Sequence, residues 1–231
     1  MSNPITYYIP EASLIPKQNR IVLSDRTVEV SSRMERPDIV VIDNFLSPEE
    51  CDFIVAAAKP KIKRSSVVNR DTGDSYVHPA RTSSGAYFAP SELSIGPTID
   101  MRIAELIRVP VTHGEGLQIL NYQVGERYLP HYDYFSPSDP GSKKHLEQGG
   151  QRIATILMYL NNVEEGGETV FPVMGNTRVM PKKGSLLYFA YTNRCGQLDP
   201  CSLHGGEPVR AGEKWVATKW IRQQPWSKPE A

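Results

Sequence analysis

The second half of the chain consists of short β-type runs separated by turn signals, and this pattern constrains the fold more than any other feature. The runs are rich in β-branched and aromatic residues and span residues 116–124, 127–135, 151–161, 168–172, 184–191, 202–209 and 214–222. Glycine stands among polar residues, as tight reversals require, at 124–126, 164–168, 182–184 and 210–213. Many short strands with regular turns favour a sandwich, barrel or jelly roll over a parallel α/β sheet.

The first half predicts further strands and two helices. Residues 38–45 form a β-rich run, and Ser47, Pro48 and Glu50 then provide the N-cap, N1 and N3 residues of a capping box. A second helix is predicted over 97–109, because apolar residues recur there at three- and four-residue spacing. We expect both helices to cover one face of a sheet, which gives a mainly β fold with flanking helices.

A length of 231 residues and a hydrophobic share of 39% suffice for one domain with a sizeable core. Residues 1–36 are polar, proline-dotted and without sustained periodicity, so we expect an N-terminal arm that lies on the domain and is partly disordered. The domain itself is expected over 37–224, followed by a short tail at 225–231. Residues 136–150 are the longest irregular stretch of the second half and predict a surface loop at the rim of a site.

Charge and composition exclude several classes of partner. Lysine plus arginine and aspartate plus glutamate both number 26, so no net basic field attracts nucleic acid or an anionic membrane surface. The sequence has no apolar run long enough to span a bilayer, and its first residues lack the order of a signal peptide. We therefore expect no nucleic-acid partner and no membrane partner.

The three cysteines, Cys51, Cys195 and Cys201, are too few for a disulfide framework, which fits a reducing compartment. We expect a cytoplasmic protein if the chain is complete, and one in the endoplasmic reticulum lumen if an N-terminal anchor has been removed. Pairing of Cys195 with Cys201 stays open. No second close-spaced pair accompanies Cys201 and His204, which argues against a tetrahedral zinc site.

The stretch HYDYF at 131–135 places an imidazole and a carboxylate two residues apart. In a strand, residues i and i+2 point to the same face, so His131 and Asp133 would present a nitrogen and an oxygen side by side. We predict His204, in the strand-like run 202–209, as the third ligand. Two imidazoles and one carboxylate hold iron(II) with open positions for a co-substrate and dioxygen. A single histidine is far more often an ordinary hydrogen-bonded residue, so the prediction depends on its neighbours.

Lys214 opens the run 214–222 and shares one face of that predicted strand with Trp220. A buried ammonium at this position would anchor the remote carboxylate of a dicarboxylate co-substrate. The alternative is a solvated lysine at a strand edge, which is the usual environment of this residue.

Five segments in this order resemble the catalytic domain of 2-oxoglutarate- and iron(II)-dependent prolyl 4-hydroxylases. They are residues 131–135, 151–172, 181–189, 203–209 and 212–222. The resemblance covers about residues 38–222, and it is closer to the stand-alone algal, plant, viral and bacterial enzymes than to the multidomain animal enzyme. It implies a double-stranded β-helix, a jelly roll flanked by helices, in agreement with the strand pattern.

The resemblance also implies roles for single residues. His131, Asp133 and His204 match the iron(II) ligands, and Lys214 matches the residue that binds the C5 carboxylate of 2-oxoglutarate. Further matches are Tyr122 and Thr169 for the co-substrate, and Glu115, Tyr128, Arg152 and Trp220 near the target proline. The carboxylate of Asp133 separates the chain from the halogenases of the superfamily, which carry a small residue at this position.

On the peptide side, Trp220 is expected to form a flat apolar wall, and Arg152 to direct its fork of donors at peptide carbonyls near the mouth of the site. A proline-rich substrate favours the extended polyproline II conformation, which enters a groove at low ordering cost. Residues 69–75 and 81–87 are polar and contain glycine, so they form either a lid over such a groove or a plain hairpin tip.

The implied activity is hydroxylation of peptidyl proline at C4, coupled to conversion of 2-oxoglutarate and dioxygen into succinate and carbon dioxide, with ascorbate as reductant. One alternative is the same chemistry on a lysyl side chain, a free amino acid or an alkylated base, the last disfavoured by the neutral net charge. The other is a non-catalytic jelly-roll binding module. The intact set of His131, Asp133, His204 and Lys214 argues against that module.

Overall fold

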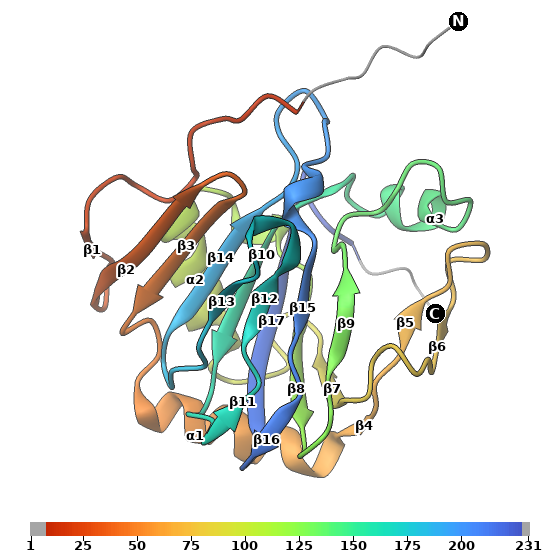
Figure 1. Ribbon diagram of the computed structural model, residues 1–231. Coiled ribbons are helices and arrows are strands. Elements are labelled where there is room, and N and C mark those ends of the chain that lie inside the picture. Colours follow the sequence, from red (N-terminus) through yellow and green to blue (C-terminus); the bar gives the residue numbers. More distant parts are fainter. Residues whose placement is uncertain (1–7, 228–231) are drawn as a thin grey trace, which may run out of the picture.

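A nine-stranded, antiparallel sheet forms the larger layer of the protein in a computed structural model that describes residues 8–227 (Figure 1). In spatial order its strands are β1 (Arg20–Val22), β2 (Thr27–Glu35), β3 (Asp38–Asp43), β14 (Leu186–Ala190), β10 (Arg152–Tyr159), β17 (Lys214–Arg222), β8 (Leu117–Tyr122), β7 (Ser84–Phe88) and β4 (Lys63–Arg64). The long strands at its centre, β10 and β17, come from the region of short β-type runs. The predicted strand content of the second half is therefore confirmed.

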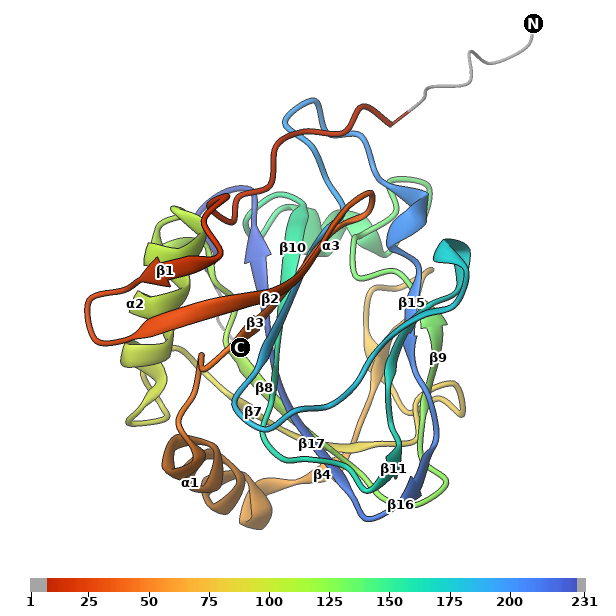
Figure 2. The same ribbon diagram turned by 60° about the vertical axis from the view of Figure 1, so that its left-hand side comes forward.

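A four-stranded sheet faces the larger one, as Figure 2 shows. Its strands, in spatial order, are β13 (Thr177–Val179), β12 (Thr169–Phe171), β15 (His204–Gly206) and β9 (Tyr128–His131). Two short pairs complete the strand set: β5 (Val67–Val68) with β6 (Ser75–Tyr76), and β11 (Glu165–Gly166) with β16 (Val209–Ala211). Two facing antiparallel sheets of this kind form a jelly roll, the predicted fold.

Helices cover the outer face of the larger sheet (Figure 2). Helix α1 (Pro48–Ala58) begins with the predicted capping box, because Ser47 Oγ accepts from the Glu50 amide at 3.2 Å and Glu50 Oε2 accepts from the Ser47 amide at 2.8 Å. Helix α2 (Gly96–Ile107) buries the predicted apolar stripe. The remaining helical segments are α3 (Ser142–Leu146), η1 (Lys59–Lys61), η2 (Val111–His113), η3 (Pro172–Met174) and η4 (Pro200–Ser202). No helix within residues 8–227 has the length and apolar character needed to cross a membrane.

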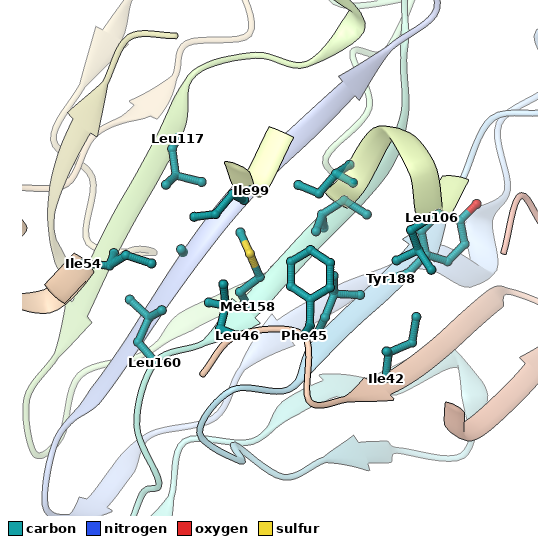
Figure 3. Packing of buried hydrophobic residues seen from close by; sticks show 14 of the residues in the cluster. Ile42, Phe45, Leu46, Ile54, Ile99, Leu106, Leu117, Met158, Leu160 and Tyr188 are labelled. Carbon is teal, nitrogen blue, oxygen red and sulfur yellow. The ribbon is translucent and has the colours of Figure 1, made fainter. Parts of the chain in front are cut away.

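The core has two layers because the larger sheet is covered on both faces. On β10, Ile156 and Met158 pack against the helices, whereas Leu157 and Tyr159 point between the two sheets. Figure 3 shows the helix-side layer, in which Met158 lies among residues of both long helices and neighbouring strands. The alternation explains why the run at 151–161 reads as almost continuously apolar, since both of its faces are buried.

The assignment of residues 1–36 to an irregular arm is wrong for residues 20–35, which form β1 and β2 of the larger sheet. These strands lie at the sheet edge, and all seven β2 positions after the first two are exposed or only partly covered. An edge strand with little burial does not show the apolar alternation that identifies a strand in sequence. Residues 1–7 of the expected arm and residues 228–231 of the expected tail lie outside the described residues.

Candidate metal centre

Three side chains meet between the two sheets. His131 ends β9 and His204 begins β15, and antiparallel pairing sets these two residues directly opposite each other. Nε2 of His131 lies 3.5 Å from Oδ1 of Asp133, and Nε2 of His204 lies 3.5 Å from Oδ2. The potential ligand atoms all lie within 4.8 Å of one another. The structure therefore brings together the three residues that were predicted to bind a metal.

His131 and Asp133 are brought together by a bend and not, as predicted, by lying on one face of a strand. Strand β9 ends at His131, and Asp133 lies in a bend beyond it. The two residues are therefore not an i, i+2 pair of a single strand. The bend directs the Asp133 carboxylate back between the imidazoles.

Backbone carbonyls hold both imidazoles in one orientation. Nδ1 of His131 lies 2.9 Å from the carbonyl oxygen of Leu129, and Nδ1 of His204 lies 3.0 Å from that of Ser202. A carbonyl only accepts a hydrogen bond, so each Nδ1 carries the proton and each Nε2 presents a lone pair toward Asp133. This arrangement is typical of histidines that bind a metal through Nε2.

Burial and charge shift the pKa values of His204 and Asp133 in the directions that favour a bound cation. Burial lowers the pKa of His204 to about 4, although the Asp133 carboxylate opposes this shift, so the imidazole is neutral. Burial by itself would raise the pKa of Asp133, but the two imidazoles and the Arg152 guanidinium hold it well below its usual range. Two neutral imidazoles and a carboxylate form the 2-His-1-carboxylate donor set that suits iron(II).

Aromatic rings enclose the imidazoles. Tyr128 stacks on His131 with ring centroids 3.6 Å apart and an interplanar angle of 21°. The ring of Phe189 lies 4.5 Å from that of His204. Burial raises the pKa of Tyr128 to about 12, so its phenol keeps its proton. Tyr128 is thus placed beside the centre, and its role toward a peptide stays a prediction.

Lys214 is buried inside the jelly roll, with a relative exposure of 4%. Tyr122 lies opposite Lys214 on the paired strand β8. The Lys214 Nζ lies 5.5 Å from the centre of the Tyr122 ring and 5.7 Å from the centre of the Tyr159 ring. Within residues 8–227 the ammonium has no hydrogen-bond or ion-pair partner. Burial lowers the pKa of Lys214 to about 8. The Glu168 carboxylate opposes this shift without bonding to the ammonium. The alternative of a solvated lysine at a strand edge is therefore wrong, and a buried cation without a bonded carboxylate can accept one from a ligand.

One of the two tyrosines near this ammonium is bonded to a buried threonine. Thr169 is buried on β12, and its Oγ1 lies 2.8 Å from the phenol oxygen of Tyr159. The sequence analysis predicted Thr169 and Tyr122 at this position but missed Tyr159. The signal was present, because two-residue periodicity puts Tyr159 on the inner face of β10. A tyrosine in an apolar run, however, reads as core packing.

A buried ion cluster stands beside the metal centre. Glu115 accepts from Arg152 Nε at 2.7 Å and from Arg152 Nη2 at 2.9 Å, and Arg222 Nη1 donates to it at 3.0 Å. Arg152 Nη1 donates to the carbonyl of Asp133 at 3.3 Å. Each of the three guanidinium nitrogens of Arg152 is thus bonded within the protein, so the expectation that its donors point at peptide carbonyls does not fit the structure. Arg222 was not predicted, since a strand-end arginine is usually solvated.

Trp220 packs against this cluster and lies opposite Thr155 of β10. The guanidinium carbon of Arg152 lies 3.9 Å from the centre of the Trp220 ring. On β17, Trp220 and Lys214 are an even number of residues apart, so both point between the sheets, as expected. Lys214 begins the strand, and Trp220 lies near its other end. A wall for a peptide remains the predicted role of Trp220.

The two segments that were predicted to form a lid have different structures. Residues 69–75 form the tip of the β5–β6 hairpin and contact the loop 136–150: the Gly141 amide donates to the Arg70 carbonyl at 2.8 Å, and Lys144 Nζ lies 2.9 Å from Asp74 Oδ1. Residues 81–87 are no lid, because most of them belong to β7 of the larger sheet. At Gly141 the two segments are so close that a Cβ would lie 2.3 Å from the Gly73 amide nitrogen.

We expect Glu115→Ala to destabilise the protein by about 3–5 kcal/mol, because it leaves two buried guanidinium groups without their carboxylate. Urea unfolding of the metal-free protein measures this change. Glu165→Ala is the matched control, since Glu165 is 63% exposed and its pair with Arg210 spans 3.8 Å; it should change stability by less than about 1 kcal/mol. Equal effects of the two substitutions would show that the cluster does not stabilise the fold.

Comparison with known proteins gives a consistent set of relatives. Residues 117–222 match the 2OG-Fe(II) oxygenase superfamily. Prolyl 4-hydroxylase 5 of Arabidopsis thaliana is 44% identical over 215 residues, which cover 85% of this chain and 72% of that protein. Probable prolyl 4-hydroxylase 10 of the same plant is 42% identical over 217 residues, which cover 86% of this chain and 73% of that protein.

Two solved structures extend the comparison. The viral collagen prolyl hydroxylase of Paramecium Bursaria Chlorella virus-1, determined as its 2OG complex, is 31% identical with a TM-score of 0.62, covering 80% of this chain and 95% of that chain. A Pseudomonas putida prolyl-4-hydroxylase has a TM-score of 0.52 and covers 80% of this chain and 92% of that chain. At 17% identity it supports the fold alone.

Proposed function

The chain belongs to the prolyl 4-hydroxylases of the 2OG-Fe(II) oxygenase superfamily, and from this we propose that its three-residue centre holds iron(II) for the hydroxylation of proline. The protein is a 2-oxoglutarate-dependent dioxygenase that converts peptidyl proline to 4-hydroxyproline. One oxygen atom of dioxygen enters the proline and the other enters succinate, as 2-oxoglutarate loses carbon dioxide. The observation that carries the residue assignment is the convergence of two Nε2 atoms and one carboxylate within 4.8 Å.

His131, Asp133 and His204 would hold the metal through two neutral imidazoles and one carboxylate. When bound, iron(II) supplies the activation of dioxygen that oxidises both 2-oxoglutarate and a C–H bond. The protein's own contribution is orientation. The carbonyls of Leu129 and Ser202 fix the imidazoles, and the aromatic walls exclude water from the centre.

Lys214 would bind the C5 carboxylate of 2-oxoglutarate. Its buried ammonium has no ion-pair partner within hydrogen-bond distance among the described residues, Tyr122 lies opposite it on β8, and Thr169 lies on β12 of the facing sheet. A carboxylate there would accept a charge-assisted hydrogen bond from Lys214. Tyr159 would keep Thr169 in place through their hydrogen bond of 2.8 Å.

On the peptide side, Trp220 and Tyr128 would form walls next to the metal. Arg152 supports this surface from behind, because it stacks on Trp220 and is itself held by Glu115. The two charged residues would thus act on the peptide through the indole that they position.

The substrate conformation and the reductant are part of the same proposal. Collagen-like, proline-rich chains, for which the viral relative is named, favour polyproline II, which needs little further ordering to bind. Ascorbate would return to iron(II) any metal that is oxidised without product formation.

Mass spectrometry of a peptide panel tests the function. The purified protein is incubated with iron(II), 2-oxoglutarate and ascorbate, together with proline-rich peptides, lysine-rich peptides or free amino acids. We expect one added oxygen on proline, at C4, with succinate released in equal amount. Oxygen on lysine or on a free amino acid would identify a different substrate class, and no succinate under any condition would identify a non-catalytic protein.

A further inference from the structure

Thr155 is buried beside the metal centre, and none of the roles assigned above uses it. It lies on β10, opposite Trp220 of β17 and Phe189 of β14. Its hydroxyl oxygen lies 2.6 Å from Oδ2 of Asp133 and 3.2 Å from the phenol oxygen of Tyr191. With relative exposures of 1% for Thr155 and 0% for Tyr191, water does not compete for these contacts.

The direction of both hydrogen bonds follows from the protons available. An ionised carboxylate only accepts, and a threonine hydroxyl carries a single proton. Thr155 therefore donates to Asp133, and Tyr191 must donate to Thr155. The result is a directed chain from a phenol through a hydroxyl to one carboxylate oxygen, and such chains strengthen their members by mutual polarisation.

The other contacts of Asp133 hold its carboxylate less closely, since each imidazole nitrogen lies 3.5 Å from a carboxylate oxygen. Arg152 binds the backbone carbonyl of Asp133 at 3.3 Å, which holds the main chain. The last torsion of an aspartate side chain is broad, so the carboxylate can still rotate. Among the described residues, Thr155 is the one hydroxyl group that binds this carboxylate.

We propose that Thr155, oriented by Tyr191, is a positioning residue for Asp133: it occupies Oδ2 and leaves Oδ1 as the oxygen available to the metal. The inference rests on the proposed function, in which Asp133 is a metal ligand. A rotating carboxylate can offer both oxygens to one cation. That would use a position that 2-oxoglutarate and dioxygen require.

Cobalt(II) binding to the full-length protein tests this role without turnover. Thr155→Val removes the hydroxyl at nearly constant shape, and Thr155→Ser retains it. Thr177→Val is the matched control, because the Thr177 hydroxyl donates to the Met174 carbonyl at 2.7 Å, outside the centre. Calorimetry gives the Kd for Co²⁺, and visible absorption of the Co²⁺ complex with 2-oxoglutarate reports the coordination of the metal.

We expect Thr155→Val to weaken Co²⁺ binding by about 10- to 100-fold and to change the absorption bands, as loss of an outer-sphere partner does. Thr155→Ser should restore both, and Thr177→Val should leave both unchanged. Wild-type affinity and absorption in Thr155→Val would overturn the proposal. A defect that serine does not repair would also overturn it, because the hydroxyl would then not be the cause.

Tyr191→Phe provides a second route if Thr155→Val does not fold. It removes the donor to Thr155 and should weaken Co²⁺ binding by a smaller factor than Thr155→Val does. Unchanged affinity and absorption would contradict the proposed hydrogen-bond chain. Wild-type protein that binds no Co²⁺ would refute the proposed function instead. The two failures are thus distinguishable.

Discussion

Alanine at His131, Asp133 or His204 is expected to abolish proline hydroxylation. Each substitution removes one of three protein donors, and its effect on metal affinity should exceed the roughly 10- to 100-fold cost of losing an outer-sphere partner. Succinate release and oxygen addition to a proline peptide measure activity, and calorimetry with Co²⁺ measures the metal affinity of the same samples.

The matched control for the histidines is His113→Ala. His113 lies in η2, and its Nδ1 contacts the carbonyl of Arg222 at 3.1 Å, away from the three ligands. This variant should keep the wild-type affinity for Co²⁺ and the wild-type activity. Full activity in any one of the three ligand variants would exclude the centre as drawn.

Lys214→Ala should have the second largest effect, on 2-oxoglutarate alone. A charge-assisted hydrogen bond contributes roughly 1.5–3 kcal/mol, so the KM for 2-oxoglutarate should rise about 10- to 150-fold while Co²⁺ affinity stays unchanged. Lys219→Ala is the control on the same strand. Lys219 points to the outer face, where its Nζ pairs with Asp100 at 2.7 Å, so its loss should lower stability and leave the KM near wild type. The opposite result would identify Lys219 as the anchor.

The pH dependence gives an independent check on Lys214. Its pKa of about 8 means that the free protein loses the ammonium proton as the pH rises through that value. Because only the charged form attracts a carboxylate, the KM for 2-oxoglutarate should rise above pH 8 by roughly tenfold for each pH unit. Lys214→Arg should remove this dependence, since a guanidinium stays protonated. A KM that is constant up to pH 10 in the wild-type protein would argue against the assignment.

Much of the fold and part of the centre could be predicted because the signals are local. The capping box at Ser47 and Glu50 lies within four residues, and burial on both faces makes β10 conspicuous in the sequence. His131, Asp133, His204 and Lys214 were found because motifs around them occur in a recognisable order. Strands β1 and β2 were not predicted, because an exposed edge strand shows no apolar alternation.

The supporting residues could not be predicted because their partners are distant in the chain. Arg222 and Glu115 are 107 positions apart, and Tyr191 and Thr155 are 36 apart. Without its partner, Arg222 is indistinguishable in sequence from a solvated arginine, and Thr155 and Tyr191 are residues common in any strand. Arg152 illustrates the error that follows. Without knowledge of Glu115 as its partner, its donors appeared free for a peptide.

The metal centre and the lysine belong to different layers of the jelly roll. His131 and His204 are residues of the four-stranded sheet, whereas Lys214 is a residue of the nine-stranded sheet. A co-substrate that is bound both to the metal and to Lys214 would connect the two sheets. Neither sheet alone would provide its complete binding site. The apolar side chains packed between the sheets set their spacing. This spacing must therefore match the length of the co-substrate. A small change in that packing would weaken co-substrate binding even when the metal ligands and Lys214 are unchanged.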